Sequence, residues 1–337
     1  MTASSADRCK PPHCSSKTGF RLTHLLLRFA LAVAGTATQA MGLTLEPAST
    51  QCDASAKPVP AVPAVPAVPA AAQQRLPQSQ AIRGQKDIVW AWLASPTTRY
   101  PHAAFGSPVH AGSLHVLAAD GSGALRELTL TLPPQRVFED RVPRLADLDG
   151  DGRDEIMLVE ADVAHGAALV VFGLRAAASA GGTAAGLALV ELARSPSLGT
   201  AFRWLNPVGV ADFDGDGQLG IASVTTPHIG GVLTLYHFRP PRLVPFARAA
   251  DVSNHRFGAL EQQLAVVIET AGRRPTVVVP DMQHRALQAL RWDPPGQWTR
   301  LEEPLPLRAR IERLTPLAGG ACALLADASW WRVTLAP

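Results

Sequence analysis

ADLDGDGRDEI, at residues 146–156, and ADFDGDGQLGI, at residues 211–221, are the two stretches that decide the fold. Each places aspartates at alternate positions with glycines between them. Carboxylates this close in the chain repel one another unless water or a cation screens their charge. Oxygen side chains that alternate around a glycine turn are the pattern of a loop that wraps a hard cation. Both stretches therefore predict a cation-binding loop.

The first loop carries side-chain oxygens at positions 1, 3, 5 and 9, and a glycine at position 6 that permits a sharp turn. The carbonyl at position 7 completes the set. Together with one or two waters, these groups supply the six to eight oxygens that Ca²⁺ prefers. Neither loop contains His or Cys, which argues against Zn²⁺ or copper. The predicted ligands are Asp147, Asp149, Asp151, the carbonyl of Arg153, and Glu155.

An EF-hand does not explain these loops. It would need a bidentate glutamate at position 12 and a helix on each side. Position 12 is Leu158 in the first loop and Ser223 in the second, and the flanking runs are typical of strands. A plainer alternative is that Asp-Gly-Asp-Gly forms a solvated tight turn without a metal. The occurrence of two copies at matching places favours a metal, at the first loop above all.

From about residue 85 onward, runs of four to eight residues rich in Val, Leu, Ile and aromatics alternate with Gly, Pro, Asp and Ser turns. No stretch has a sustained helical period, so an all-β fold is expected. Asp147 and Asp212 lie 65 residues apart, and the strands after each can be aligned. Decayed copies of the loop are expected at residues 268–277 and 315–324, and neither of these has the acids to bind a metal.

Four-stranded units that repeat in this way are the signature of propeller blades, and we expect four or five of them. A β-sandwich with calcium loops explains the strand-by-strand match less well. The last unit is short, so it is expected to borrow a strand from the N-terminal side, near Asp87 to Leu93.

DLDGDGRDEI resembles the loop of FG-GAP/VCBS repeats, the blades of the integrin-α-like β-propeller. The resemblance is strong over two loops and their following strands, and a weaker repeat extends it over most of residues 85–337. It implies one Ca²⁺ at the first loop and a second Ca²⁺ held by Asp212, Asp214, Asp216 and the carbonyl of Gln218. The second loop departs from the family pattern because position 9 is Gly220, so a weaker site is expected there.

The N-terminal region predicts export. Scattered basic residues precede an apolar run at 29–37 that is too short to span a bilayer, and small residues follow, so cleavage after Ala40 or Ala37 is expected. An uncleaved anchor is the alternative. The predicted organisation is a signal peptide at 1–40, a disordered Pro/Ala-rich linker at 41–84 and the propeller at 85–337. We expect a periplasmic, cell-surface or secreted protein with no integral membrane span after cleavage.

Net charge excludes a nucleic-acid-binding protein. Five of the 31 Lys and Arg residues and one of the 28 acidic residues lie in residues 1–40, so the remainder carries 26 bases and 27 acids. Removal of the signal also leaves two of the four cysteines, Cys52 and Cys322. A disulfide between them and two free thiols are both compatible with the sequence.

The sequence offers little evidence for catalysis. It has no nucleophile elbow, no HExxH, no P-loop and no GxGxxG that opens a helix. The pairs Pro101-His102 and Pro227-His228 recur at matching places; they either converge on a ligand or, as we favour, simply shape a loop. The tryptophans are more typical of core positions than of sugar-stacking loops. They are Trp90, Trp92, Trp204, Trp292, Trp298, Trp330 and Trp331.

The sequence is best explained as an exported, calcium-stabilised binding or interaction module without chemistry of its own. Its ligand, a protein or a glycan, cannot be named from the sequence, and neither can the oligomeric state. The alternative is an extracellular propeller enzyme that acts on a polysaccharide or another polymer. Acidic, basic and histidine side chains that converge at the central axis would favour the enzyme, and an axis without them would favour the module.

Overall fold

The computed structural model describes residues 42–48, 52, 67–120, 122–177, 186–293, 295–300 and 303–336. The described chain is all-β, with the short 3-10 helix η2 (Ala70–Gln74). The predicted signal peptide at 1–40 lies outside the described residues, as does much of the Pro/Ala-rich stretch. Among the residues that are described, no helix has both the length and the apolar character needed to cross a membrane.

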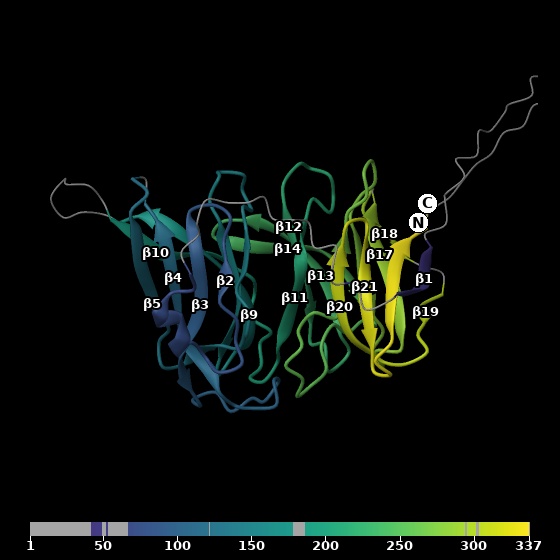
Figure 1. Cartoon of the computed structure of the whole chain (residues 1–337), viewed down its shortest axis with the longest axis horizontal. Coiled ribbons are helices and arrows are strands. Elements are labelled where there is room, and N and C mark those ends of the chain that lie inside the picture. Colours follow the sequence, from purple (N-terminus) through teal and green to yellow (C-terminus); the bar gives the residue numbers. More distant parts are fainter. Residues whose placement is uncertain are drawn as a thin grey trace, which may run out of the picture. The chain divides into compact units, whose positions relative to one another are not determined.

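The described strands form five consecutive units of mostly antiparallel strands (Figure 1). Single bridges, Ala111 to Phe138 and Arg194 to Arg242, connect the first three units into one continuous sheet. The units are β2 (Ile82–Arg83), β3 (Ile88–Thr97), β4 (His110–Ala119) and β5 (Leu125–Thr131); β6 (Arg136–Phe138), β7 (Arg144–Ala146), β8 (Glu155–Asp162), β9 (Gly166–Ala176) and β10 (Leu187–Arg194); β11 (Leu205–Ala211), β12 (Gly220–Thr225), β13 (Val232–Arg239) and β14 (Arg242–Ala250); β15 (Val266–Ile268), β16 (Thr276–Pro280), β17 (Ala286–Asp293), β18 (Gln297–Arg300) and β19 (Leu305–Pro306); and β20 (Ile311–Leu317), β21 (Gly320–Leu325), β22 (Trp330–Leu335) and β1 (Leu43–Ala48).

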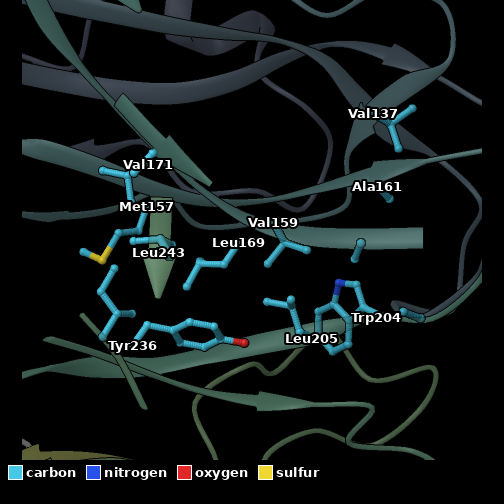
Figure 2. Close-up of a cluster of buried hydrophobic side chains, with 14 of the residues drawn as sticks. Val137, Met157, Val159, Ala161, Leu169, Val171, Trp204, Leu205, Tyr236 and Leu243 are labelled. Atoms are coloured by element: carbon cyan, nitrogen blue, oxygen red, sulfur yellow. The ribbon is translucent and has the colours of Figure 1, made fainter. Parts of the chain in front are cut away.

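The cores lie between consecutive units. Figure 2 shows one of them, where Met157 and Leu169 of the second unit face Leu205, Tyr236 and Leu243 of the third. Equivalent clusters join the first unit to the second, the third to the fourth and the fourth to the fifth. The central strands β8 and β9 are therefore buried on both faces along most of their length, which explains the apolar runs at residues 156–159 and 167–174. Consecutive four-stranded sheets that pack face to face make this an all-β fold of β-propeller type.

The segments that were aligned in the sequence occupy equivalent strands. Residues 155–161 and 220–226 give β8 and β12. Residues 168–174 and 231–238 give β9 and β13, and the segments that begin at residues 189 and 243 give β10 and β14. The two expected decayed loops also lie at the equivalent connection, between the first and second strands of the fourth and fifth units. The Asp-Gly loops therefore indicated the repeat with the correct register.

The strand that completes the last unit differs from the prediction. Residues 88–97 form β3 inside the first unit, and β1 is the strand that pairs with β22, from Leu43 opposite Leu335 to Ala48 opposite Trp330 (Figure 1). The linker predicted at 41–84 is accordingly wrong at its two ends, where β1, η2 and β2 are folded. Alternation in LTLEPA gives β1 one inward face, with Leu43 packed into the core of the last two units.

A disulfide joins Cys52, just after β1, to Cys322 in the middle of β21. It spans 270 residues of sequence and fastens the N-terminal strand to the C-terminal unit a second time.

We predict that removal of this disulfide destabilises the fold. Closing so long a loop restricts the unfolded chain, so replacing both cysteines, C52S/C322S, should lower the free energy of unfolding by about 2–5 kcal/mol. Urea denaturation of wild type and variant, each with and without dithiothreitol, measures this. The reductant should weaken the wild type and leave the variant unchanged, and equal stability of the two oxidised proteins would contradict the prediction.

Candidate functional site

The loops of the fold separate into two groups at opposite ends of the sheets. β6 and β7 pair with successive parts of β8 and together form the first strand of the second unit. The Asp-Gly loops then join the first and second strands of their units, whereas 98–109, 226–231 and 281–285 join the second and third. Successive antiparallel strands reverse direction, so the two groups lie at opposite ends. We call them the aspartate end and the histidine end. The connections 195–204 and 251–265, which lead from one unit to the next, also lie at the histidine end.

At the aspartate end, the first loop brings three of its predicted ligands together, and Asp151 lies outside this group. Oxygens of Asp147, Asp149 and Glu155 lie within 4.8 Å of one another. Gly152 holds the turn with a φ of 85° and donates its N–H to Asp147 at 3.1 Å. The N–H of Arg153 donates to Asp151 at 2.9 Å. The side chain of Arg153 donates to the carbonyl of Leu174.

Two oxygens of this loop are buried without a hydrogen-bond partner. They are Oδ1 of Asp147 and Oε1 of Glu155, whose side chain has no exposed surface. The other oxygen of Glu155 accepts the N–H of Leu148 at 2.8 Å. Burial, with the nearby charges of Asp149 and Asp151, raises the pKa of Glu155 to about 7. A cation bound among these oxygens would give both unpartnered atoms a ligand role, so the donor set fits Ca²⁺.

The second loop is arranged differently. Both carboxylate oxygens of Asp212 accept backbone N–H groups, from Gly215 at 2.6 Å and Gly217 at 3.1 Å. Arg239 forms a salt bridge with Asp216 at 2.9 Å and also donates to the side chain of Gln218. In this loop the negative charge is therefore partly compensated by a guanidinium of the protein.

A histidine lies opposite Gly220, the position at which the first loop has Glu155. Gly220 pairs with His237 of β13, whose Nε2 lies 3.7 Å from Asp214. Asp214, Asp216 and His237 form the second group of potential metal ligands among the described residues. The sequence did not predict His237 because it lies 17 positions after Gly220 and only the β12–β13 register brings it back.

A cavity of about 730 Å³ opens among the first strands of the units. Its charged lining groups are paired within the protein. Arg144 binds Asp140 at 2.9 Å, and Arg313 binds Glu261 at 2.5 Å. The rest of the lining combines apolar side chains with side-chain amides, of which Gln262 donates to Asp140 at 3.0 Å.

Asp140 is the hub of a buried polar network beside this cavity. Its carboxylate accepts the N–H groups of Arg141 and Val159 as well as the side chains of Arg144 and Gln262. Asn206 continues the network from the third unit, donating to the carbonyls of residues 254 and 262. The links from Gln262 to Asp140 and from Arg144 to Asn206 cross between different units, so the network helps to fix how the units meet around the cavity.

At the histidine end, side chains from separate loops pack into one aromatic cluster. Trp204, whose indole donates to the carbonyl of Glu139, stacks on His228 with ring centroids 5.6 Å apart. His228 in turn lies 2.8 Å from His255 through Nε2 and Nδ1. Burial, and secondarily neighbouring histidines, lowers the pKa of His228 to about 4 and that of His255 to about 3, so both are neutral at pH 7.

Below this cluster lies a buried carboxylate. Glu139 follows β6, has no exposed surface, and places Oε1 2.6 Å from Nδ1 of His102. Its second oxygen has no partner. Burial raises the pKa of Glu139 to about 7, and the hydrogen bond with His102 limits the rise. The hydrogen bond between Glu139 and His102 fixes the orientation of the imidazole.

The sequence indicated the recurring Pro-His pairs but not the residues that their histidines contact. His102 and His228 both contact the ring of Phe257, at centroid distances of 5.8 and 5.3 Å. Neither Glu139 nor Phe257 has a local signal, because one interrupts a strand and the other lies in an irregular loop. Only the meeting of loops from different units assembles the group.

Comparisons with known proteins leave the family open. No protein-family model matches the chain, and no curated protein matches it. Among solved structures, BamB from Moraxella catarrhalis is similar with 15% identity and a TM-score of 0.37, over 75% of this chain and 68% of that one. A putative 6-phosphogluconolactonase from Bacteroides fragilis is similar with 14% identity and a TM-score of 0.36, over 73% of this chain and 62% of that one.

We predict that Glu139 makes stability depend on pH. Its pKa is higher in the folded than in the unfolded protein, so its contribution is fully present below about pH 4.5 and is lost as pH rises through about 7. Glu139→Gln should remove a decline of at most about 3 kcal/mol between these limits. Urea denaturation across pH 5–8 measures the decline, with the exposed Glu127→Gln as the matched control. An unchanged slope in Glu139→Gln would contradict the prediction.

Proposed function

We propose that this chain is an exported, calcium-stabilised propeller of FG-GAP/VCBS type with five blades, which serves as a binding module without chemistry of its own. The five units of the described chain correspond to the blades, with β1 completing the last one. The two carboxylate loops occupy the same connection in consecutive units, which is the placement that the family resemblance implies. The observation that carries the proposal is the pair of buried, unpartnered oxygens in the first loop.

Calcium in the first loop would be held by Asp147, Asp149, Asp151, Glu155 and the carbonyl of Arg153. As a hard cation it would neutralise the carboxylates and tie the loop to the start of β8. The second loop, with Asp212, Asp214, Asp216 and the carbonyl of Gln218, is proposed as the weaker site. The salt bridge from Arg239 must open or tilt away before a cation can use both oxygens of Asp216.

The cavity supports binding over catalysis. Its charged side chains form internal pairs, Arg144 with Asp140 and Arg313 with Glu261, rather than a set of free acids and bases. A cavity of about 730 Å³ lies within the size range of small-ligand sites. The exposed aromatic side chains at the histidine end provide a second binding surface. Protein and glycan ligands both suit a module of this kind.

Export is supported by two features of the N-terminal region. The composition of residues 1–40 is that of a signal peptide. The disulfide between Cys52 and Cys322 is of a kind that persists in oxidising compartments. N-terminal sequencing of the protein recovered outside the cytoplasm should find a chain that begins at Thr38 or Met41. An intact N-terminus on that protein would contradict cleavage.

We predict that calcium stabilises the protein through the first loop. Calcium at 100 times its Kd adds about 2.7 kcal/mol to the free energy of unfolding, so EDTA should lower the Tm and calcium should restore it. Asp149→Asn removes one anionic ligand and should weaken calcium binding by about tenfold or more. Calorimetric titration of EDTA-treated protein measures the affinity.

Asp214→Asn is the matched control for this experiment, because it removes the equivalent aspartate from the second loop. It should leave the strong binding event unchanged. A Tm that does not respond to EDTA, together with no calcium released to the chelator, would refute the calcium part of the proposal.

A further inference from the structure

The histidine end carries a continuous aromatic surface, which we define as His102, Phe202, His228 and Phe257. Phe257 contacts both imidazoles, and Phe202 lies 5.6 Å from His102 between ring centroids. Phe202 is 44% exposed and Phe257 is 60% exposed. Two large apolar rings held open to water beside buried polar groups are typical of a contact surface rather than of packing.

The hydrogen bonds of His228 determine which of its nitrogens is left as an acceptor. His255 approaches the carbonyl of Ala259 through Nε2 at 3.0 Å, and a carbonyl only accepts, so this nitrogen carries the proton. Neutral His255 therefore accepts at Nδ1, and the Nε2–H of His228 donates to it at 2.8 Å. Nδ1 of His228 is left with a lone pair that meets no donor within the described part of the chain.

Glu139 determines in the same way which nitrogen of His102 donates. When this carboxylate is ionised it only accepts, so His102 donates through Nδ1 at 2.6 Å, and in the neutral imidazole Nε2 keeps its lone pair. No donor from the described residues meets that nitrogen. The aromatic surface thus combines two exposed phenyl rings with two imidazole acceptors, each fixed by a buried partner.

Charge selects among the ligands that such a surface suits. Two of the ionisable groups packed against it have partners within the protein: Glu139 shares a hydrogen bond with His102, and Arg256 forms a salt bridge with Glu312. Arg141 lies over the ring of Phe105, which packs on Trp204, and it donates to the carbonyls of residues 77 and 109. A complementary ligand is uncharged, has flat C–H faces for the phenyl rings, and has hydroxyl donors for the imidazoles.

Sugars have these properties, and we propose that the surface formed by His102, Phe202, His228 and Phe257 binds a neutral glycan. The inference rests on the proposed function as a binding module and names the ligand class. A pyranose ring stacks on Phe257, and its hydroxyl groups donate to Nδ1 of His228 and Nε2 of His102. Phe202 extends the contact to a neighbouring sugar.

The test is calorimetric titration of the calcium-loaded full chain at pH 8 with four neutral oligosaccharides. Cellohexaose, chitohexaose, maltohexaose and mannohexaose are the probes. At least one should bind saturably. Phe257→Ala should weaken that binding by about tenfold or more, as expected for a central aromatic contact. Phe257→Tyr retains the ring and should stay within about threefold of wild type. Leu125→Ala, which shortens another exposed apolar residue on β5, is the control and should have no effect.

Equal Tm values would confirm that these variants are folded. Because the side chain of Phe257 is exposed, its replacement is expected to leave the fold intact. Nitrogen NMR of the imidazoles provides a second measurement, in which Nδ1 of His228 and Nε2 of His102 should be unprotonated at pH 8 and shift when the sugar binds. Either nitrogen found protonated would overturn the recognition scheme.

Further outcomes separate this inference from the proposed function. Binding that ignores Phe257→Ala, no binding of any probe, or binding only of an acidic oligosaccharide such as hexamannuronate would overturn it. Hexamannuronate is included because Arg203 adjoins Phe202 in sequence. A peptide or protein ligand that requires Phe257 while all sugars fail would overturn the glycan assignment and leave the binding module intact. Loss of calcium binding with sugar binding retained would overturn the calcium part of the proposed function and leave the glycan assignment intact.

Discussion

The antiparallel pairing of β1 with β22 is the contact on which the rest of the fold depends. It joins residues about 290 positions apart, as in the hydrogen bond between Thr44 and Thr334. Without β1, the fifth unit would keep only three strands and an open edge of unpaired backbone groups, while part of its core would lose Leu43. The four larger cores of the described chain each lie between two consecutive units, so the position of each sheet depends on its neighbours.

The two ends of the sheets have different physical tasks. At the aspartate end, carboxylates crowd together, and their repulsion is relieved in part by Lys86 beside Asp147 in the first loop and by Arg239 beside Asp216 in the second; a bound cation would relieve it further. At the histidine end, neutral and largely buried histidines are fixed through hydrogen bonds, as in the chain from His228 through His255 to Ala259. Charge thus stabilises one end, whereas hydrogen-bond direction and ring packing organise the other.

The sequence predicted the repeat well because its signal is local. Asp147 and Asp212 mark the same connection in two units, and the strands after them keep their register. It failed at β1, because LTLEPA is six residues beside a low-complexity stretch and its partner lies at the other end of the chain. Glu139 and Phe257 were missed for a related reason: neither belongs to a motif, and only loops from separate units bring them to His102.

The position of β1 also bears on how this chain could be re-engineered. Gly42 and Ala336 already meet through a backbone hydrogen bond of 2.9 Å, so the start of β1 and the end of β22 are neighbours in space. A short linker there would make a circular permutant in which β22 runs directly into β1 as an ordinary hairpin. New ends could then be opened between β1 and η2, and all five units would become contiguous in sequence. In the natural order, the first strand can pair only once the last strand is present, so assembly of the fold depends on a long-range contact.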